Sequence, residues 1–313
     1  MYDIIGDVHG HAGLLKKLLI KMGYTKSNGC FSHPERKAVF VGDFINRGPE
    51  IRKTIRMIRA MVEQGCAFAI LGNHEINAII YNLKDEQGRL LVNKPNKYFL
   101  SLFKTINEYD PGSSEWKEDV KWMRTLPLFL DLGDIRVVHA CWSNEAIEIV
   151  NALYTDGKIK KKVFRKIYKK GNSPISKAVW TITKGVNLKM PRDLKILNNK
   201  GVSPRSIRIR WWIQPEGQTF GQSCFDSKYE LPNYTIPQEI LPTTFPYPDN
   251  APLVFFGHYC RGRGPNIIRH NICCVDSCVT GTKTLCAYRW NGEKELTMNN
   301  LVHYREHENI SNN

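Results

Sequence analysis

An apolar run leads directly into a polar, glycine-containing loop in the stretch YDIIGDVHGH (residues 2–11), and an amphipathic stretch follows it. The same order returns twice: residues 38–41 precede the loop 42–49, and residues 67–71 precede the loop 72–75. Apolar strands that alternate with amphipathic helices indicate an α/β fold with a largely parallel, covered sheet. Ligands bind at the carboxyl ends of strands in such sheets. The pattern therefore predicts a site formed by these three loops.

The later sequence contains further strand-like runs that belong to the same core. Residues 128–132 and 135–138 flank Gly133-Asp134 and predict a hairpin whose second strand ends at His139. The run 253–256 ends at Gly257-His258, and the run 272–275 ends at Asp276. Asn291-Gly292 is a strong hairpin signal and predicts that strands 285–290 and 295–298 pair, before a polar, frayed tail from residue 303.

Length and composition favour one large domain. The chain has 313 residues, of which 42% are hydrophobic, so it can bury a sizeable core. We therefore expect a single domain over residues 1–313, with an insertion or cap at about residues 143–250, where the core pattern is interrupted. No apolar run reaches the roughly 20 residues of a membrane span, and no signal-peptide pattern opens the sequence. Nine scattered cysteines without a CxxC pair predict reduced thiols and a cytoplasmic location.

The chain is strongly basic, with a formal net charge of +15, which favours anionic partners. Much of the excess lies in one run, residues 158–170. Within it Ile159, Val163 and Ile167 recur every four residues, which predicts a helix with a buried apolar stripe and a solvated basic face. The alternative interpretation is a docking patch for a polyanion such as RNA.

Polar side chains that can bind a metal stand at the ends of the predicted strands. They are Asp7, His9, Asp43, Asn73, His139 and His258. Carboxylates, imidazoles and an amide suit Mn²⁺, Fe²⁺ or Zn²⁺. A bridging carboxylate would hold two ions at the ~3.5–4 Å separation typical of two-metal hydrolases.

Five ordered motifs carry a family resemblance: GDVHG (6–10), GDFINRG (42–48), GNHE (72–75), VHA (138–140) and GH (257–258). They resemble those of the calcineurin-like metallophosphoesterases, in the phosphoprotein-phosphatase branch. More narrowly, the chain is similar to bacterial serine/threonine phosphatases and diadenosine tetraphosphatase-like proteins. This resemblance implies a four-layer αββα sandwich of two mixed β-sheets flanked by helices. It also implies a dimetal site at one rim, most often with Mn²⁺, and with iron or zinc as alternatives.

The resemblance also implies a role for each motif residue. Asp7 and His9 would hold the first ion, Asp43 would bridge, and the second ion would bind Asn73, His139 and His258. His74 would be the general acid for the leaving oxygen, and Arg47 would bind the phosphate. A second phosphate-binding arginine is expected among Arg208, Arg210, Arg261 and Arg263. The expected reaction is attack of a metal-bound hydroxide on phosphorus, for which two cations lower the pKa of water from 15.7 towards ~7.

Asn46 departs from the family pattern, in which an aspartate holds the catalytic histidine. An amide oxygen accepts a hydrogen bond but carries no negative charge. Asn46 therefore predicts a less basic His74 and weaker catalysis of leaving-group departure. A good leaving group, such as a polyphosphate, would suffer less from this change.

The sequence leaves three functions open. The first is hydrolysis of a phosphomonoester, including a phosphoprotein, and the second is hydrolysis of a dinucleoside polyphosphate. The third is a catalytically weakened scaffold that binds RNA or another polyanion through the basic run, which the intact set of six ligands argues against. No membrane partner is expected. Trp211-Trp212 are expected to pack inside the cap rather than to stack on a nucleobase.

Overall fold

The computed structural model describes residues 1–92, 97–110, 113–155, 158–191, 194, 204–225, 229–242, 246–260 and 265–306. Five strands form the first sheet in the order β16-β15-β1-β4-β5, namely Leu301–Arg305, Thr284–Trp290, Tyr2–Ile5, Lys37–Phe40 and Ala67–Ala69. β1, β4 and β5 are parallel, while β15 and β16 run antiparallel. The repeated pattern at the start of the chain thus forms the parallel half of a mixed sheet, as expected.

The second sheet is also five-stranded and mixed, in the order β13-β14-β12-β7-β6. Its strands are Asn266–Arg269, Ile272–Cys274, Leu253–Phe256, Ile135–Val138 and Phe129–Asp131. β14, β12 and β7 are parallel, and β6 pairs with β7 as the predicted hairpin. The polar loops after β7 and β12 therefore leave the sheet on the same side.

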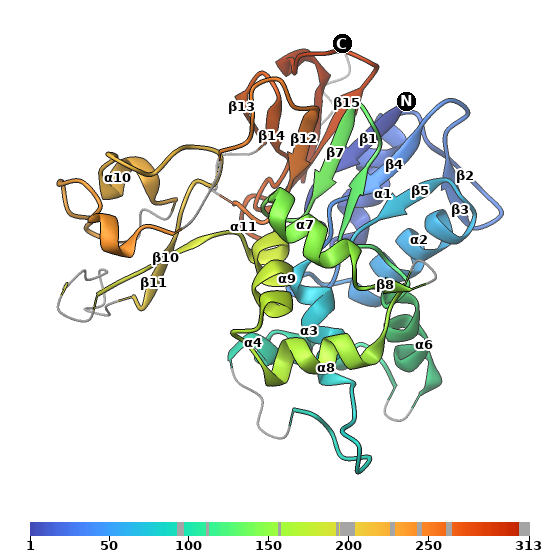
Figure 1. Ribbon diagram of the computed structural model, residues 1–313. Helices are drawn as coiled ribbons and strands as arrows, with labels where there is room; N and C mark the ends of the chain where they lie inside the picture. Colours follow the sequence, from blue (N-terminus) through green and yellow to red (C-terminus); the bar gives the residue numbers. More distant parts are fainter. Residues whose placement is uncertain are drawn as a thin grey trace.

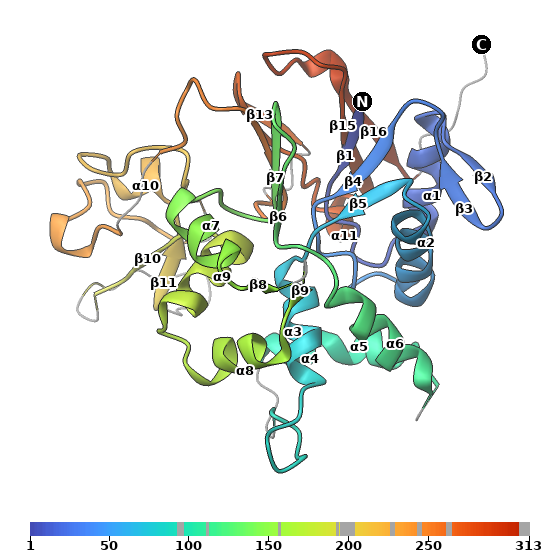
Figure 2. The same cartoon turned by 45° about the vertical axis from the view of Figure 1, so that its right-hand side comes forward.

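The two sheets pack face to face, with helices on both outer faces (Figures 1 and 2). Side chains alternate along each strand, so Ile4 joins the cluster between the sheets whereas Ile5 faces the helices. Val39, Val137 and Phe255 fill the same inter-sheet layer and are fully buried. The expected four-layer αββα sandwich is confirmed.

Helices α1 (Ala12–Lys21) and α2 (Ile51–Glu63) cover the first sheet, and α7 (Asn144–Asn151) and α9 (Pro174–Lys184) lie beside the second (Figure 2). The remaining helices are α3 (Asn73–Tyr81), α4 (Lys97–Leu100), α5 (Leu102–Ile106), α6 (Ser114–Met123), α8 (Lys161–Lys169), α10 (Phe220–Ser223), α11 (Val279–Thr282), η1 (Gln238–Ile240) and η2 (Met298–Asn300). Short two-stranded ribbons pair β2 (Thr25–Ser27) with β3 (Cys30–Ser32), β8 (Tyr154–Thr155) with β9 (Lys158–Ile159), and β10 (Asn187–Lys189) with β11 (Ser206–Arg208). Within the part of the chain that the structure describes, every helix is too short or too polar to cross a bilayer.

The last strand pair differs from the expected Asn-Gly hairpin. β16 begins at Leu301, so the connection spans residues 291–300 and the segment 295–298 is not a strand. The Glu293 carboxylate accepts hydrogen bonds from the Asn291 backbone and the Tyr288 hydroxyl, and Leu296 N–H donates to the carbonyl of His270 in the other sheet. These contacts favour a wider loop over a two-residue turn. Residues 303–305 lie in β16 rather than in a frayed tail, and residues 307–313 are outside the described residues.

The region 143–250 contains two kinds of structure. α7 and α9 pack on each other beside the second sheet, whereas β10, β11 and α10 project to one side around a separate small apolar cluster (Figure 1). The basic run forms α8, with Val163 and Ile167 buried as expected. Ile159 is buried too, but it lies in β9 ahead of the helix.

Candidate metal centre

Five loops from both sheets meet at one rim of the sandwich. Asp7 and His9 follow β1, Asp43 follows β4, and Asn73 opens the helix after β5. His139 follows β7 and His258 follows β12. Five of the six side chains are buried and His258 is half-buried. The structure thus brings together all the ligands that the sequence predicted.

Two glycines allow this close approach. A Cβ on Gly257 would lie 2.0 Å from an oxygen of Asp7, and a Cβ on Gly72 would lie 2.2 Å from an oxygen of Asp43. Five non-glycine residues of the site also adopt positive φ angles, namely His9, Asp43, Asn46, Arg47 and His258. Such angles are uncommon for residues with a Cβ and mark a backbone held by its surroundings.

The two carboxylate oxygens of Asp43 face two different groups of ligands. Oδ2 lies 3.8 Å from His9 Nε2, which is itself 4.0 Å from Asp7. Oδ1 lies 3.4 Å from His139 Nε2, which is 3.3 Å from the amide oxygen of Asn73. The nitrogen of His258 completes this second group within 4.8 Å. Asp43 therefore has the geometry of a carboxylate shared by two cation sites.

Hydrogen bonds orient the imidazoles for metal binding. Nδ1 of His9 lies 3.0 Å from the carbonyl of Ile45, and Nδ1 of His139 lies 2.7 Å from that of Val41. Each ring therefore presents Nε2 to the site, as in many metal-binding histidines. Nε2 of His258 is buried and has no hydrogen-bond partner among the described residues. A divalent ion would satisfy this nitrogen, so the residues fit a metal.

Burial and neighbouring charges shift the pKa values of the site residues in different directions. Burial raises the pKa of Asp7 well above its usual value, and the nearby Asp276 raises it further. Burial acts in the same direction on Asp43, but His139 and His74 outweigh it and hold the pKa of Asp43 well below its usual value. For His139, burial is outweighed by Asp43, and its pKa rises to about 10. Crowded carboxylates and imidazoles of this kind are relieved when cations replace protons.

His74 lies beside this cluster, with Nε2 3.7 Å from Asp43 and 3.4 Å from Arg47. Its Nδ1 faces the amide nitrogen of Asn46 at 2.5 Å. The amide oxygen of Asn46 is taken by the Thr105 hydroxyl, which donates to it. The expectation that the amide oxygen of Asn46 accepts a hydrogen bond from His74 is therefore wrong. The Thr105 hydroxyl occupies that oxygen, so the amide nitrogen faces His74 instead.

This orientation sets the state of the His74 ring. An amide N–H₂ that donates to Nδ1 leaves the proton of the neutral ring on Nε2. The Arg47 guanidinium, which is itself only a donor, then lies 3.4 Å from Nε2 without a hydrogen bond to it. Burial, Arg47 and His139 lower the pKa of His74 to about 4, against the opposing charge of Asp43. These causes favour the neutral ring at pH 7, and the effect of Asn46 on the acidity of His74 stays a prediction.

Of the two candidate second arginines that the structure describes, Arg208 contacts a residue of the cluster and Arg210 does not. Nη1 of Arg208 donates to the carbonyl of His258 at 3.0 Å, and its positive charge, after burial, lowers the pKa of His258. Arg210 instead donates to the carbonyl of Gln222. Arg261 and Arg263 lie outside the described residues.

Glu75 supports the site although sequence reasoning gave it no role. Its buried carboxylate accepts backbone N–H groups of Gly72, Asp43 and Phe44 at 2.8–3.1 Å, which fixes the Asp43 loop against α3. Burial and the charge of Asp43 raise its pKa to about 7. The sequence contained a signal for this contact, because a glutamate three residues after a helix N-cap can accept the N-cap backbone N–H, as Glu75 accepts that of Gly72.

The loops after β12 and β14 are joined by a disulfide between Cys260 and Cys278. The expectation that all cysteines are reduced thiols is therefore wrong for this pair, because two adjacent parallel strands place their following loops side by side. The other seven cysteines are free, as expected. Asp276 accepts a hydrogen bond from the backbone N–H of Cys278 at 2.8 Å and so caps the turn after β14.

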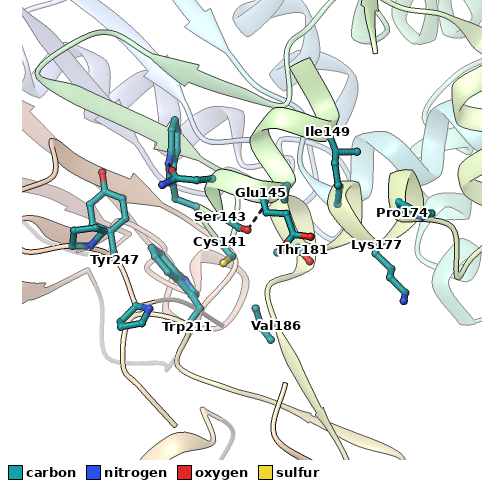
Figure 3. A pocket seen from close by; sticks show the side chains of 16 residues that line it. Cys141, Ser143, Glu145, Ile149, Pro174, Lys177, Thr181, Val186, Trp211 and Tyr247 are labelled. Carbon is teal, nitrogen blue, oxygen red and sulfur yellow. Dashed lines mark hydrogen bonds between the residues drawn. The ribbon is translucent and has the colours of Figure 1, made fainter. Parts of the chain in front are cut away.

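A cavity of about 490 Å³ lies between α7, α9 and residues 246–248 (Figure 3). Trp211, Tyr247, Glu145, Lys177 and Cys141 are among the residues that line it. None of the six metal-binding candidates does, so this cavity is separate from the rim where the chemistry gathers. Trp211 and Trp212 are buried against Phe256, which confirms that they pack in the interior.

Comparison with known proteins gives a consistent result. A family model described as calcineurin-like phosphoesterase matches residues 2–262. A protein from Oceanobacillus iheyensis named bis(5'-nucleosyl)-tetraphosphatase PrpE (asymmetrical) is 36% identical over 144 residues, which cover 44% of this chain and 54% of that protein. The protein of that name from Bacillus subtilis is 35% identical over 147 residues, which cover 44% and 57%. This chain therefore spans about half the length of the curated relatives it matches.

Several solved structures match over most of the chain, and one of them illustrates the likeness. It is the cold-active protein-tyrosine phosphatase of a psychrophilic Shewanella species, with 16% identity and a TM-score of 0.50. The match covers 92% of this chain and 74% of that one. At this level of identity the likeness concerns the fold.

Proposed function

The chain belongs to the calcineurin-like phosphoesterase family, and from this membership we propose that it is a dimetal-dependent phosphoesterase. The observation that supports the proposal best is Asp43, whose two oxygens face separate ligand groups. A site for a single ion would need only one group of ligands, not a carboxylate placed between two groups that each contain imidazoles. Asp7 and His9 would hold one ion, and Asn73, His139 and His258 the other. Six ligands arranged in this way favour an enzyme over a scaffold that only binds polyanions.

We assign different catalytic roles to different residues of the site. The six candidate ligands would hold two divalent ions, which would lower the pKa of water and offset the charge of the phosphate. Arg47 would present its planar guanidinium to the non-bridging oxygens, and its position 3.4 Å from His74 supports this role. His74 offers its Nε2 proton to the leaving oxygen. Arg208 is the second candidate for a phosphate contact.

Several finer assignments accompany this proposal. We expect Mn²⁺ at the site, with iron or zinc as alternatives, because the ligands mix carboxylate, imidazole and amide groups. The substrate is a phosphorylated small molecule, a nucleotide or a phosphoprotein, and the location is cytoplasmic. The region 143–250 acts as a cap, since α9 brings part of it against the ligand strands. Nucleic acid is a weaker candidate, because α8 buries the apolar face of the basic run as an ordinary amphipathic helix does.

A dinucleoside polyphosphate is a second candidate substrate beside a phosphomonoester. Two observations favour it: the matched relatives are named bis(5'-nucleosyl)-tetraphosphatases, and His74 receives a donor from Asn46 where a strong acid would need an acceptor. A phosphate leaving group requires little protonation, whereas an alkoxide requires a great deal.

A panel of metal-reconstituted assays tests the proposed function. Protein stripped of metal and then given Mn²⁺ should hydrolyse at least one of three substrates: p-nitrophenyl phosphate, a dinucleoside tetraphosphate or a phosphopeptide. The stripped protein should be inactive. Turnover that is equal with and without metal, or the absence of turnover on all three substrates with every metal tried, would overturn the proposal.

Replacing Asn46 by aspartate should accelerate hydrolysis of esters with poor leaving groups. A carboxylate would accept a hydrogen bond from His74 Nδ1 and stabilise the imidazolium, so His74 would become a stronger acid. Aspartate also tolerates the positive φ at this position. We expect kcat on an alkyl phosphate to rise about 10-fold, a part of the ~10²–10⁴-fold range of general acids. An unchanged alkyl phosphate rate, measured beside a dinucleoside tetraphosphate as the insensitive reference, would contradict this account.

A further inference from the structure

The disulfide between Cys260 and Cys278 joins two loops at the rim where the candidate metal ligands gather. Cys260 stands two residues after His258, in the loop that follows β12, and Cys278 stands two residues after Asp276, in the loop that follows β14. β12 and β14 are parallel neighbours, so both loops leave the sheet on the same side. The bridge therefore ties the loop that carries a candidate ligand to the adjacent loop.

Both loops adopt conformations that need support from their surroundings. His258 has a φ of 63° and Cys278 a φ of 55°, in the left-handed region that residues with a Cβ rarely adopt. The backbone N–H of His258 donates to the Asp7 carboxylate at 3.2 Å, and that of Cys278 donates to Asp276 at 2.8 Å. Arg208 donates to the carbonyl of His258. Hydrogen bonds thus hold the two loops in part, and the disulfide adds a covalent constraint.

This bridge differs from a disulfide that serves only to stabilise a fold. Stabilising disulfides are typical of small secreted domains, whereas this chain has 313 residues and an extensive buried core. The other seven cysteines are free, and six of them are buried. Cys260 is exposed, so a thiol reagent can reach its sulfur. In the reducing compartment expected for this chain, an accessible disulfide is usually transient or regulatory.

We propose that the Cys260–Cys278 pair is a redox-sensitive modification site that controls metal binding at His258. The inference goes beyond the proposed function and uses its metal centre. With the bridge intact, His258 is held among the ligands of the second ion. Once the bridge is reduced, the loop that carries His258 is less firmly held, and the ion that this residue shares with Asn73 and His139 binds more weakly.

The reactant is a small dithiol, and the reaction is thiol–disulfide exchange. One thiolate of the dithiol attacks the exposed sulfur of Cys260, the protein S–S bond breaks, and the sulfur of Cys278 leaves with the electron pair and takes up a proton. The second thiolate of the reactant then attacks the sulfur that is bound to Cys260, and Cys260 leaves in the same way. Two electrons have passed to the bridge, which becomes two thiols, and the dithiol has become a cyclic disulfide.

The first experiment compares Mn²⁺ binding in the two redox states by calorimetric titration of metal-free protein. Protein reduced with dithiothreitol and desalted without oxygen should bind one of its two ions about 10-fold more weakly than oxidised protein, at the lower end of the roughly 10–100-fold effect of groups that orient a metal ligand. Reoxidation should restore the affinity. Alkylation after denaturation should count seven thiols in the oxidised protein and nine in the reduced protein.

Two variants show whether the effect passes through the bridge. Cys260→Ser removes the disulfide without a reductant and should reproduce the weaker binding, and dithiothreitol should then change nothing further. Cys66→Ser removes a free, half-buried thiol and should respond to dithiothreitol as the wild type does. Equal Mn²⁺ affinities in oxidised and reduced wild type, or a dithiothreitol effect that persists in Cys260→Ser, would overturn the proposal.

The second experiment uses the reciprocity of linked equilibria and does not need turnover. If the bridge strengthens Mn²⁺ binding about 10-fold, saturating Mn²⁺ must favour the bridge over the two thiols by the same factor. Incubation in mixtures of reduced and oxidised dithiothreitol, followed by alkylation, measures this shift. A thiol-to-disulfide ratio that does not respond to Mn²⁺ would overturn the redox proposal alone. Protein that binds no ion in either redox state would overturn the metal centre as well, so the two failures are distinguishable.

Discussion

The Asp43→Asn variant should retain its fold and lose about 10³-fold or more in kcat. Asparagine matches aspartate in shape, tolerates the φ of 52° at this position, and can still accept the backbone N–H of His74 through its amide oxygen. It cannot, however, place an anionic oxygen in both ligand groups. Loss of one ion removes several kcal/mol of charge stabilisation in the transition state, which corresponds to roughly three orders of magnitude in rate.

The measurement pairs metal content with turnover. Elemental analysis after dialysis should fall from two Mn²⁺ per chain in the wild type to one or fewer in the variant, with an unchanged circular dichroism spectrum. Asp110→Asn, an exposed aspartate away from the cluster, is the matched control and should keep both ions. A variant at position 43 that keeps two ions and full activity would remove the shared carboxylate from the mechanism.

The His74→Gln variant should lose about 10²-fold on an alkyl phosphate and much less on a dinucleoside tetraphosphate. Glutamine retains a polar side chain but cannot transfer a proton, and the contribution of a positioned acid grows with the basicity of the leaving oxygen. The selective loss would show that His74 acts on the leaving group. A uniform loss on both substrates would instead indicate a role in holding the metals or the substrate.

A double variant makes this test sharper. In the His74→Gln background, Asn46→Asp should no longer accelerate alkyl phosphate hydrolysis, because its effect passes through the imidazole. His303→Gln, on the exposed strand β16, serves as the control for loss of an imidazole. An Asn46→Asp gain that survives without His74 would mean that position 46 acts by another route.

The convergence of the candidate ligands could be predicted from the sequence, because they lie in short local motifs at strand ends. Asp7, Asp43 and His139 each follow an apolar strand, and parallel strands bring such loops to one edge without further information. The orientation of Asn46 was not predictable, because it depends on Thr105, 59 residues further along the chain.

The errors in the fold have physical causes of the same kind. Asn291-Gly292 suggested a tight turn, but Glu293 and the backbone of Leu296 find partners that open the loop. The pairing of Cys260 with Cys278 follows from the adjacency of β12 and β14, which spacing along the chain does not show. Local sequence patterns therefore predicted the strands, whereas contacts between distant residues determined the length of the last loop and the pairing of the cysteines.

The left-handed backbone at His9, Arg47 and His258 implies that this protein is less robust than its fold allows. Each such residue costs on the order of 1–3 kcal/mol relative to a relaxed conformation. Glycine at any of these positions would relieve the backbone strain, but under the proposed function it would also remove a side chain that binds a metal or the phosphate. Without selection for activity, such substitutions would increase folding stability and eliminate turnover. At these three positions, folding stability and catalytic activity favour different residues.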